Sequence, residues 1–385
     1  MIPTRTAGLE ESPYLRRALR EADPERALLG VDRQRRHLVH YGDPLAEYWA
    51  LLEGVVLWDT AHHRQVELAG PGAMAFVQSL VTRDLSGHEV GQAKYAFMTN
   101  GAGGIIGDPV VLRLDEDRFW LNATDADLHE WCRALARAGG HDVVVTVPDV
   151  APVQVQGPHA PAVMGDLFGD EVPDLGYYRL VRRRLRGLDL VISRTGWGGT
   201  AGFEVYVIDA RADDNARAEQ WWDIVLHAGE RHDIVAAAPN HVRRIESGMV
   251  ALGRDVDEST TPLEVGDGYS WMVDLDQPDE FVGKAALVAQ RAAGPPTRLV
   301  AVDLDGPDLG GFVGDDPETS GPLPASRGGV EVATLTSAGH SPRLRRNIGL
   351  LRVPVSTAAL GTTFAIVHPV HGPIEATVVP KPHLA

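Results

Sequence analysis

Residues 193–207 of the chain read SRTGWGGTAGFEVYV, a loop of small residues that runs into an alternating apolar segment. Trp197 is the one large aromatic residue of the loop, and the apolar segment predicts a strand that carries Glu204. A glutamate between Phe203 and Val205 is unusual, because burying an unpaired carboxylate costs free energy. Glu204 is therefore either paired within the protein or an acceptor for a ligand, and a carboxylate suits a ring that offers two parallel N–H groups.

On both sides of this stretch, helical and strand patterns alternate as far as residue 294. From Thr297 onward, short strand-like segments are separated by turns, which predicts an all-β C-terminal domain, a barrel or a sandwich. Gly294-Pro295-Pro296 marks the boundary, and a loop is expected at 309–322. The fold class is therefore α+β. The predicted helices cover residues 12–30, 44–54, 73–85, 125–139, 159–169, 218–232, 240–255 and 281–294.

Composition excludes several classes of function. The chain has 385 residues and a formal net charge of −17, and a dispersed acidic surface disfavours nucleic acid and anionic membranes as partners. Residues 1–23 carry charges throughout, and no stretch approaches the roughly 18 apolar residues of a membrane span. We therefore expect a cytoplasmic protein. The single cysteine, Cys132, lies in a predicted helix and is expected to be a small buried apolar side chain rather than a nucleophile.

The glycine-rich segment 100–108, NGAGGIIGD, invites a dinucleotide-binding interpretation, but Ile106 stands where the fingerprint requires glycine, and a strand follows instead of a helix. The segment predicts a hairpin turn. What remains is Asp108, which precedes Pro109. A residue before proline is held extended, so Asp108 can point its carboxylate from a strand end into a cleft.

His62 and His63 are adjacent, and on a strand their side chains would face opposite sides, which makes them poor joint ligands of one metal ion. No HExxH motif, no cysteine cluster and no carboxylate–histidine spacing supports a metal site. We therefore expect no bound metal. One of the two histidines is a candidate substrate contact, and packing is the alternative.

Six segments, in this order, resemble the aminomethyltransferase family, whose founding member is the T-protein of the glycine cleavage system. The resemblance runs from about residue 45 to the C-terminus and depends on specific motifs, among them TGWGGTAGFEVYV and RRIESGMVALGRDVDESTTPLEVG. The segments are residues 58–85, 91–112, 195–207, 243–266, 281–287 and 335–350.

The resemblance implies a three-domain cloverleaf around a central tetrahydrofolate pocket, which ends in a barrel-like module. Residues 1–293 would form the folate-binding region, with two interwoven α+β domains, one of them at roughly 55–150. Residues 297–385 would form the C-terminal β-barrel-like domain, in agreement with the β-rich tail inferred from the strand pattern.

The resemblance also assigns residues to the cofactor. Glu204 falls on the family's pterin-binding glutamate, and Trp197 would line the same pocket. Tyr95 and Arg244 fall on family motifs near the folate or the domain interface. Arg343 falls on the C-terminal motif that closes over the cofactor.

One departure from the family pattern bears on the reaction. Glycine-cleaving members typically read Ile-Asp-Asp after the glycines, whereas residues 106–109 read Ile-Gly-Asp-Pro, so one carboxylate is missing. This change, with LWDTAHHRQ in place of FDVSHMG, resembles the demethylase branch, such as dimethylsulfoniopropionate demethylase. The implied enzyme moves a methyl group from a small sulfonium, quaternary ammonium or methoxy donor to nitrogen 5 of tetrahydrofolate and yields 5-methyltetrahydrofolate. Asp108 would be catalytic, and His62 or His63 would contact the donor.

Two alternatives stay open. The first is aminomethyl transfer from a lipoyl carrier, which releases ammonia and forms methylene-tetrahydrofolate. The second is a non-catalytic folate-binding helper, as in the iron–sulfur repair members of the family. Those members typically carry a KGC-type motif, and here FVGKAAL has Lys284 but no cysteine, which disfavours this reading. In the enzymatic readings the partners are folate and a small-molecule donor.

Overall fold

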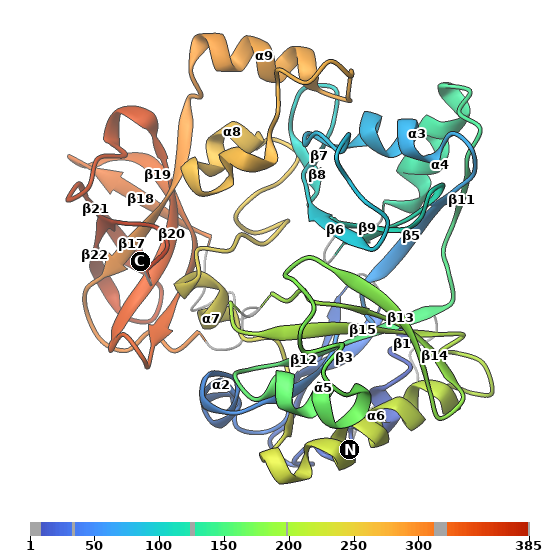
Figure 1. Cartoon of the computed structure of the whole chain (residues 1–385). Coiled ribbons are helices and arrows are strands. Elements are labelled where there is room, and N and C mark those ends of the chain that lie inside the picture. Colours follow the sequence, from blue (N-terminus) through green and yellow to red (C-terminus); the bar gives the residue numbers. More distant parts are fainter. Residues whose placement is uncertain (1–8, 33–34, 124–127, 198, 312–321, 384–385) are drawn as a thin grey trace.

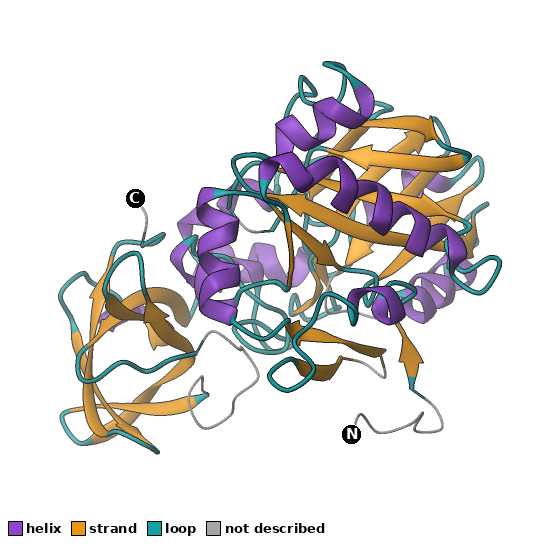
Figure 2. Cartoon of the chain, turned by 90° about the horizontal axis from the view of Figure 1, so that it is seen from below, coloured by secondary structure: helices purple, strands orange, loops and turns teal. Residues whose placement is uncertain are grey.

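The computed structural model describes residues 9–32, 35–123, 128–197, 199–311 and 322–383. They form a cloverleaf of two helix-and-sheet lobes and one barrel (Figure 1). Seen from below, the barrel stands as a separate lobe beside the other two (Figure 2). Within the described residues, no helix combines the length and the apolar character needed to cross a membrane.

The first lobe holds a five-stranded sheet in the order β11-β5-β10-β9-β6. Alternate residues of its strands, such as Val66 and Leu121, pack against helices α3 and α4 on the outer face. Cys132 lies fully buried in this core, which confirms the expectation of a small packed side chain. The bounds are β5 Arg64–Ala69, α3 Ala73–Leu80, β6 Gln92–Tyr95, β9 Val110–Asp115, β10 Arg118–Ala123, α4 His129–Ala138 and β11 Val144–Thr146.

The second lobe holds a six-stranded sheet in the order β13-β14-β15-β12-β4-β16. Phe203, Val205 and Val207 point outward from β15 into a core covered by helices α5 and α6. The intervening residues Glu204 and Tyr206 therefore face the first lobe, because side chains alternate along a strand. The bounds are β4 Val56–Asp59, β12 Val150–Gln156, α5 Ala160–Phe168, β13 Leu180–Leu185, β14 Leu188–Ser193, β15 Gly202–Ile208, α6 Ala216–Gly229 and β16 Val235–Ala237.

The two sheets face each other, with helices on both outer sides (Figure 1). Part of the space between them is an apolar core in which the rings of Trp120 and Tyr206 lie 5.6 Å apart. The rest is lined by polar side chains and forms the candidate site. A small N-terminal sheet and α2 lie beside it, with bounds β1 Glu10–Glu11, α1 Leu15–Ala18, β2 Leu28–Asp32, β3 Arg35–His40 and α2 Pro44–Glu53.

The C-terminal strands close into a six-stranded barrel in the order β17-β20-β19-β18-β21-β22, which confirms the prediction of a barrel-like C-terminal domain. The exact domain boundaries stay a prediction. The barrel strands are β17 Thr297–Leu304, β18 Leu323–Arg327, β19 Val330–Ser341, β20 Arg346–Pro354, β21 Thr363–His368 and β22 Gly372–Val379. The connecting elements are β7 Met98–Thr99, β8 Ile105–Gly107, α7 His241–Glu246, α8 Pro262–Val265 and α9 Lys284–Ala293.

Two helix predictions were wrong in extent. The region 12–30 contains a helix of only four residues, α1, and its end pairs as β2 with β3, because Pro24 interrupts the helical pattern and tertiary strand pairing prevails. The helix predicted at 240–255 stops after α7, where Gly248 adopts a left-handed φ of 71°. Residues 125–127 of another predicted helix, and most of the loop predicted at 309–322, lie outside the described residues.

Candidate functional site

A cavity of about 1040 Å³ lies between the two sheets and is also lined by the β2–β3 hairpin and the segment after α7. Its volume suits a ligand of cofactor size. Seven of the eight predicted site residues line it, although they come from distant parts of the sequence. These residues are His62, His63, Tyr95, Asp108, Trp197, Glu204 and Arg244.

Glu204 is the most completely surrounded acidic residue of the cavity, with 6% of its side chain exposed. Its Oε1 accepts hydrogen bonds from Gln154 Nε2 at 2.8 Å and Asn122 Nδ2 at 3.5 Å. Its Oε2 accepts from the hydroxyls of Thr195 and Tyr206. Burial raises the pKa of Glu204, and these four hydrogen bonds partly offset that rise. The carboxylate is therefore fixed in direction at the cavity wall.

The hydrogen-bond partners of Glu204 were not predicted from the sequence. Gln154 lies opposite Glu204 in the register of β12 and β15, and Asn122 reaches it from the facing sheet. Gln65 donates to Asn122 and Asn122 to Tyr206, so a chain of hydrogen bonds crosses between the sheets. A signal was present: in residues 150–156, VAPVQVQ, two glutamines alternate with valines and so mark a polar inner face.

Asp108 lies between β8 and β9, where the Asp-Pro sequence was expected to direct it into a cleft. Its Oδ2 accepts a hydrogen bond of 2.6 Å from the Tyr95 hydroxyl, while its Oδ1 is buried without a hydrogen-bond partner among the described residues. Burial raises the pKa of Asp108 to about 6, although the Tyr95 hydrogen bond lowers it. The group can therefore exchange a proton near neutral pH.

The two adjacent histidines do not lie on a strand. They occupy the turn before β5, so the expectation of opposite faces was wrong: their rings meet edge to face, with centroids 4.0 Å apart. His37 of β3 stacks on His62 at 4.4 Å. Burial lowers the pKa of His63 to about 3 and holds that of His62 well below 6.5, so both rings are neutral. Among the described residues, no three His, Cys, Asp or Glu side chains are arranged to hold a metal ion.

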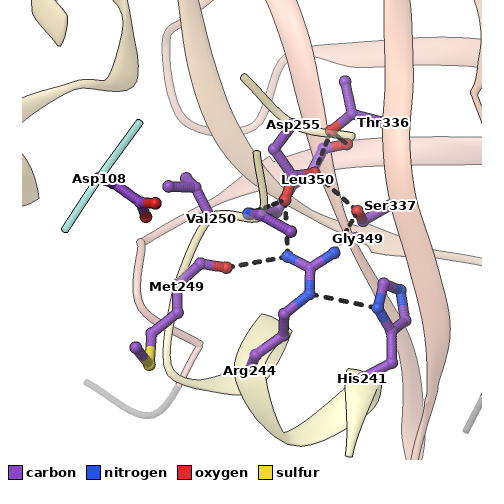
Figure 3. A network of polar contacts seen from close by, with 12 residues as sticks. Asp108, His241, Arg244, Met249, Val250, Asp255, Thr336, Ser337, Gly349 and Leu350 are labelled. Atoms are coloured by element: carbon purple, nitrogen blue, oxygen red, sulfur yellow. Dashed lines mark hydrogen bonds and ion pairs between the residues drawn. The ribbon is translucent and has the colours of Figure 1, made fainter. Parts of the chain in front are cut away.

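Arg244 reaches the cavity from α7 with its hydrogen bonds already made inside the protein. Its Nη1 donates to Asp255 Oδ2 at 2.6 Å and to the Met249 carbonyl, and its Nη2 donates to Ser337 of the barrel. Its Nε donates to His241 Nδ1 at 3.2 Å. Figure 3 shows this network together with the segment of Met249 and Val250 on the side of Asp108. Arg244 therefore ties the cavity wall to the barrel.

Asp255→Asn should destabilise the protein by about 3–5 kcal/mol, because it leaves the buried charge of Arg244 unpaired. Burial raises the pKa of Asp255, but Arg244 and the Ser337 and Thr336 hydroxyls lower it further, so the net pKa lies below 3.8. The stabilisation is therefore present at neutral pH and is lost as the pH falls through that depressed value.

Urea unfolding measures the effect of Asp255→Asn. Asp276→Asn is the matched control, because it removes the carboxylate of the exposed Arg291 pair and should change stability little. Equal midpoints for the two variants would contradict a role of Asp255 in holding the lobes together.

Arg343 is the one predicted site residue that does not line the cavity. It lies exposed in the turn between β19 and β20, and its charge acts on Arg243 rather than on the cavity-lining residues. Its contact with the cofactor stays a prediction.

Four polar atoms of cavity-lining residues lack a hydrogen-bond partner among the described residues. Asp108 Oδ1, Gln154 Oε1, Trp58 Nε1 and His241 Nε2 are buried and have no hydrogen-bond partner among the described residues, and all four residues line the cavity. Unpaired buried donors and acceptors are costly unless a ligand or water satisfies them. Together they offer both acceptors and donors to a bound ligand.

A family model described as the GCVT N-terminal domain matches residues 40–277, and one described as the glycine cleavage T-protein C-terminal barrel domain matches residues 309–384. The chain belongs to the glycine cleavage T-protein family. It is therefore a folate-dependent one-carbon transferase, and tetrahydrofolate is its one-carbon carrier.

Two curated relatives represent two activities within the glycine cleavage T-protein family. Dimethylsulfoniopropionate demethylase DmdA of Ruegeria pomeroyi is 33% identical over 83% of each chain. An aminomethyltransferase of Desulfitobacterium hafniense is 29% identical over 89% of this chain and 90% of its own. The crystal structure of aminomethyltransferase T from Bartonella henselae has the same fold, with a TM-score of 0.83, 22% identity and coverage of 97% and 98%.

Proposed function

We propose that the chain is a tetrahydrofolate-dependent methyltransferase that demethylates a small, positively charged donor, a sulfonium or a quaternary ammonium, in preference to a methoxy compound. The observation that carries this proposal is Asp108. It is a single carboxylate with one unpaired oxygen at the cavity, next to Gly107, where the resemblance to glycine-cleaving members implies a second acid. One negative charge in a buried site offsets one positive charge on a donor. The likeness to DmdA of Ruegeria pomeroyi supports the same branch.

Glu204 is the proposed anchor of the pterin ring. Gln154 and Thr195 align its carboxylate, and two ring N–H groups would replace the longer contacts from Asn122 at 3.5 Å and Tyr206 at 3.3 Å. Trp197, half-buried on the loop before β15, offers a flat apolar face beside it. Tetrahydrofolate, once bound, supplies nitrogen 5 as the nucleophile that takes the one-carbon group.

Asp108 has two proposed roles in the reaction. With a pKa of about 6, it is ionised at neutral pH, so it attracts and orients a cationic donor. The same carboxylate is placed to accept the proton that is released when a secondary amine becomes methylated. Tyr95 holds one oxygen and so leaves the other directed at the cavity. His62 and His63, neutral and packed together, would form the donor's apolar and aromatic surroundings.

The acid limb of the pH profile should follow Asp108. Its pKa is raised to about 6 and the active form is deprotonated, so kcat/KM should be full above pH 6 and fall as the pH drops through it. Tyr95→Phe removes a hydrogen bond that lowers this pKa, so the midpoint should move to higher pH. Tyr48→Phe, which breaks a hydrogen bond to Glu246 away from the cavity, is the control. Identical midpoints for Tyr95→Phe and wild type would contradict the role of Asp108.

A donor screen tests the proposal. The protein is incubated with tetrahydrofolate and dimethylsulfoniopropionate, trimethylsulfonium, glycine betaine or an aryl methyl ether, and the folate product is identified by mass. 5-Methyltetrahydrofolate from a cationic donor is the expected result. Methyl transfer only from the aryl ether would overturn the cationic class.

Aminomethyl transfer is the second candidate, because several relatives near 30% identity are aminomethyltransferases. It predicts methylene-tetrahydrofolate from an aminomethylated lipoyl carrier and no product from the methyl donors. Tight folate binding with no transfer from any donor would favour a non-catalytic helper instead.

A further inference from the structure

A row of side chains crosses the inner face of the six-stranded sheet in strict register. Glu204 of β15 is opposite Gln154 of β12, Gln154 is opposite Trp58 of β4, and Trp58 is opposite Ala237 of β16. Neighbouring strands lie about 4.8 Å apart, so Trp58 is about 10 Å from Glu204 along this row. The cavity therefore extends from the proposed pterin anchor toward Trp58.

Trp58 presents a donor at the far part of this row. Its side chain is 1% exposed and lines the cavity, and its Nε1 has no hydrogen-bond partner among the described residues. An indole N–H can only donate. Burying it without an acceptor costs free energy, and tryptophan N–H groups usually find a partner when buried.

His241 presents a second donor, and its tautomer follows from its neighbour. The Arg244 Nε–H donates to His241 Nδ1, so Nδ1 carries no proton and the neutral ring holds its proton on Nε2. That Nε2 is buried without a partner among the described residues, and His241 is 7% exposed and lines the cavity. Burial and the charges of Arg244 and Arg254 hold the pKa of His241 well below 6.5, which keeps this tautomer over the physiological range.

The strand order brings the two donors into one region. Ala237 is paired with Trp58 at the end of β16, and the chain reaches His241 only four residues later. The cavity wall between them is formed by Ala238 and Pro239. Neither side chain of this wall offers an acceptor, and no backbone carbonyl pairs with either donor among the described residues, so an acceptor group on a bound ligand can satisfy both.

We propose that Trp58 and His241 form a subsite for an anionic oxygen group, a carboxylate, at the end of the methyl donor opposite its cationic centre. This inference rests on the proposed function and deepens it. Arg254 lines the same cavity and brings positive charge to this region, whereas the charge of Arg244 behind the His241 ring is already paired with Asp255. Asp108 takes the cation, and the donor is a zwitterion such as a sulfonium or ammonium carboxylate.

Trp58→Phe and His241→Asn test the subsite on the intact protein. Trp58→Phe keeps an aromatic ring but removes the N–H together with part of the indole, and binding of the methyl ester controls for that lost volume. His241→Asn keeps a side-chain oxygen in reach of Arg244 but withdraws the donor, whereas His241→Gln retains an N–H at the longer reach. Calorimetry on the protein saturated with tetrahydrofolate measures Kd for dimethylsulfoniopropionate and for its methyl ester, which keeps the sulfonium and loses the anion. A separate titration measures folate binding.

The two loss variants, Trp58→Phe and His241→Asn, should each raise the Kd of dimethylsulfoniopropionate about tenfold or more. Hydrogen bonds to charged groups contribute about 1.5–3 kcal/mol each. Binding of the ester and of folate should change less than about twofold, and His241→Gln should recover part of the affinity. An equal loss of affinity for the methyl ester and for dimethylsulfoniopropionate would overturn the subsite. A loss of folate affinity instead assigns the two donors to the cofactor and also overturns it.

The proposed function fails separately. If dimethylsulfoniopropionate binds in the variant-dependent way described but yields no 5-methyltetrahydrofolate, the subsite stands and the methyltransferase proposal falls. If methylfolate forms from it with unchanged KM in both loss variants, the methyltransferase stands and the subsite falls.

Discussion

Glu204→Ala should weaken tetrahydrofolate binding by about a hundredfold or more. The wild-type carboxylate lines the cavity and is aligned by Gln154 and Thr195, so two ligand N–H groups that replace the longer contacts of Asn122 and Tyr206 would bind an acceptor already held in place. Hydrogen bonds to charged groups contribute about 1.5–3 kcal/mol each, and 1.4 kcal/mol corresponds to a tenfold change in affinity. Calorimetric titration with tetrahydrofolate measures the effect.

Two further variants keep this test interpretable. Glu204→Gln preserves the shape and one acceptor oxygen, so it should fold normally and bind folate with intermediate affinity. Glu67→Ala removes another glutamate between the same lobes, one that pairs with Arg118 and Trp120 and does not line the cavity. It should leave folate affinity unchanged. Wild-type affinity in Glu204→Ala would remove Glu204 from the pterin site.

Asp108→Asn should lower kcat by about 10²–10⁴-fold and leave the Kd of tetrahydrofolate within about threefold of wild type. Asparagine keeps an oxygen that can accept the Tyr95 hydrogen bond, so the local structure should persist. It has no negative charge for a cationic donor and cannot take up a proton. Single-turnover kinetics with saturating folate separate this loss from binding.

Asp84→Asn is the control for Asp108→Asn. Asp84 accepts hydrogen bonds from Ser86 in an exposed turn and does not line the cavity, so its variant should retain full turnover. A kcat of Asp108→Asn near the wild-type value would show that positioning alone drives the reaction.

The sequence predicted the residues whose local context is unusual. Glu204 stands out because it interrupts an apolar run, and Asp108 because proline fixes it in an extended conformation. The all-β C-terminal domain was predicted because its strands follow one another at short intervals, whereas its barrel form, rather than a sandwich, was implied only by the family resemblance. These features are local, so a single chain segment carries enough information to reveal them.

Contacts across sheets could not be predicted in the same way. Gln154 and Asn122 lie 50 and 82 residues from Glu204, and only the strand register and the facing of the lobes bring them together. His241 was hidden inside a helical pattern that continues past Glu246, whereas the structure ends the helix so that Asp255 can fold back onto Arg244. The left-handed Gly248 ends the helix, and the residues after it are placed by tertiary contacts that local periodicity does not reveal.

The isotope content of the folate product tests the central claim most directly. The protein is given tetrahydrofolate and dimethylsulfoniopropionate whose S-methyl groups carry three deuterium atoms each. Methyl transfer breaks the carbon–sulfur bond and leaves every carbon–hydrogen bond intact, so 5-methyltetrahydrofolate with three deuterium atoms is the predicted product. Methylene-tetrahydrofolate with two deuterium atoms, or unlabelled methylene-tetrahydrofolate formed only from an aminomethylated carrier, would contradict the account.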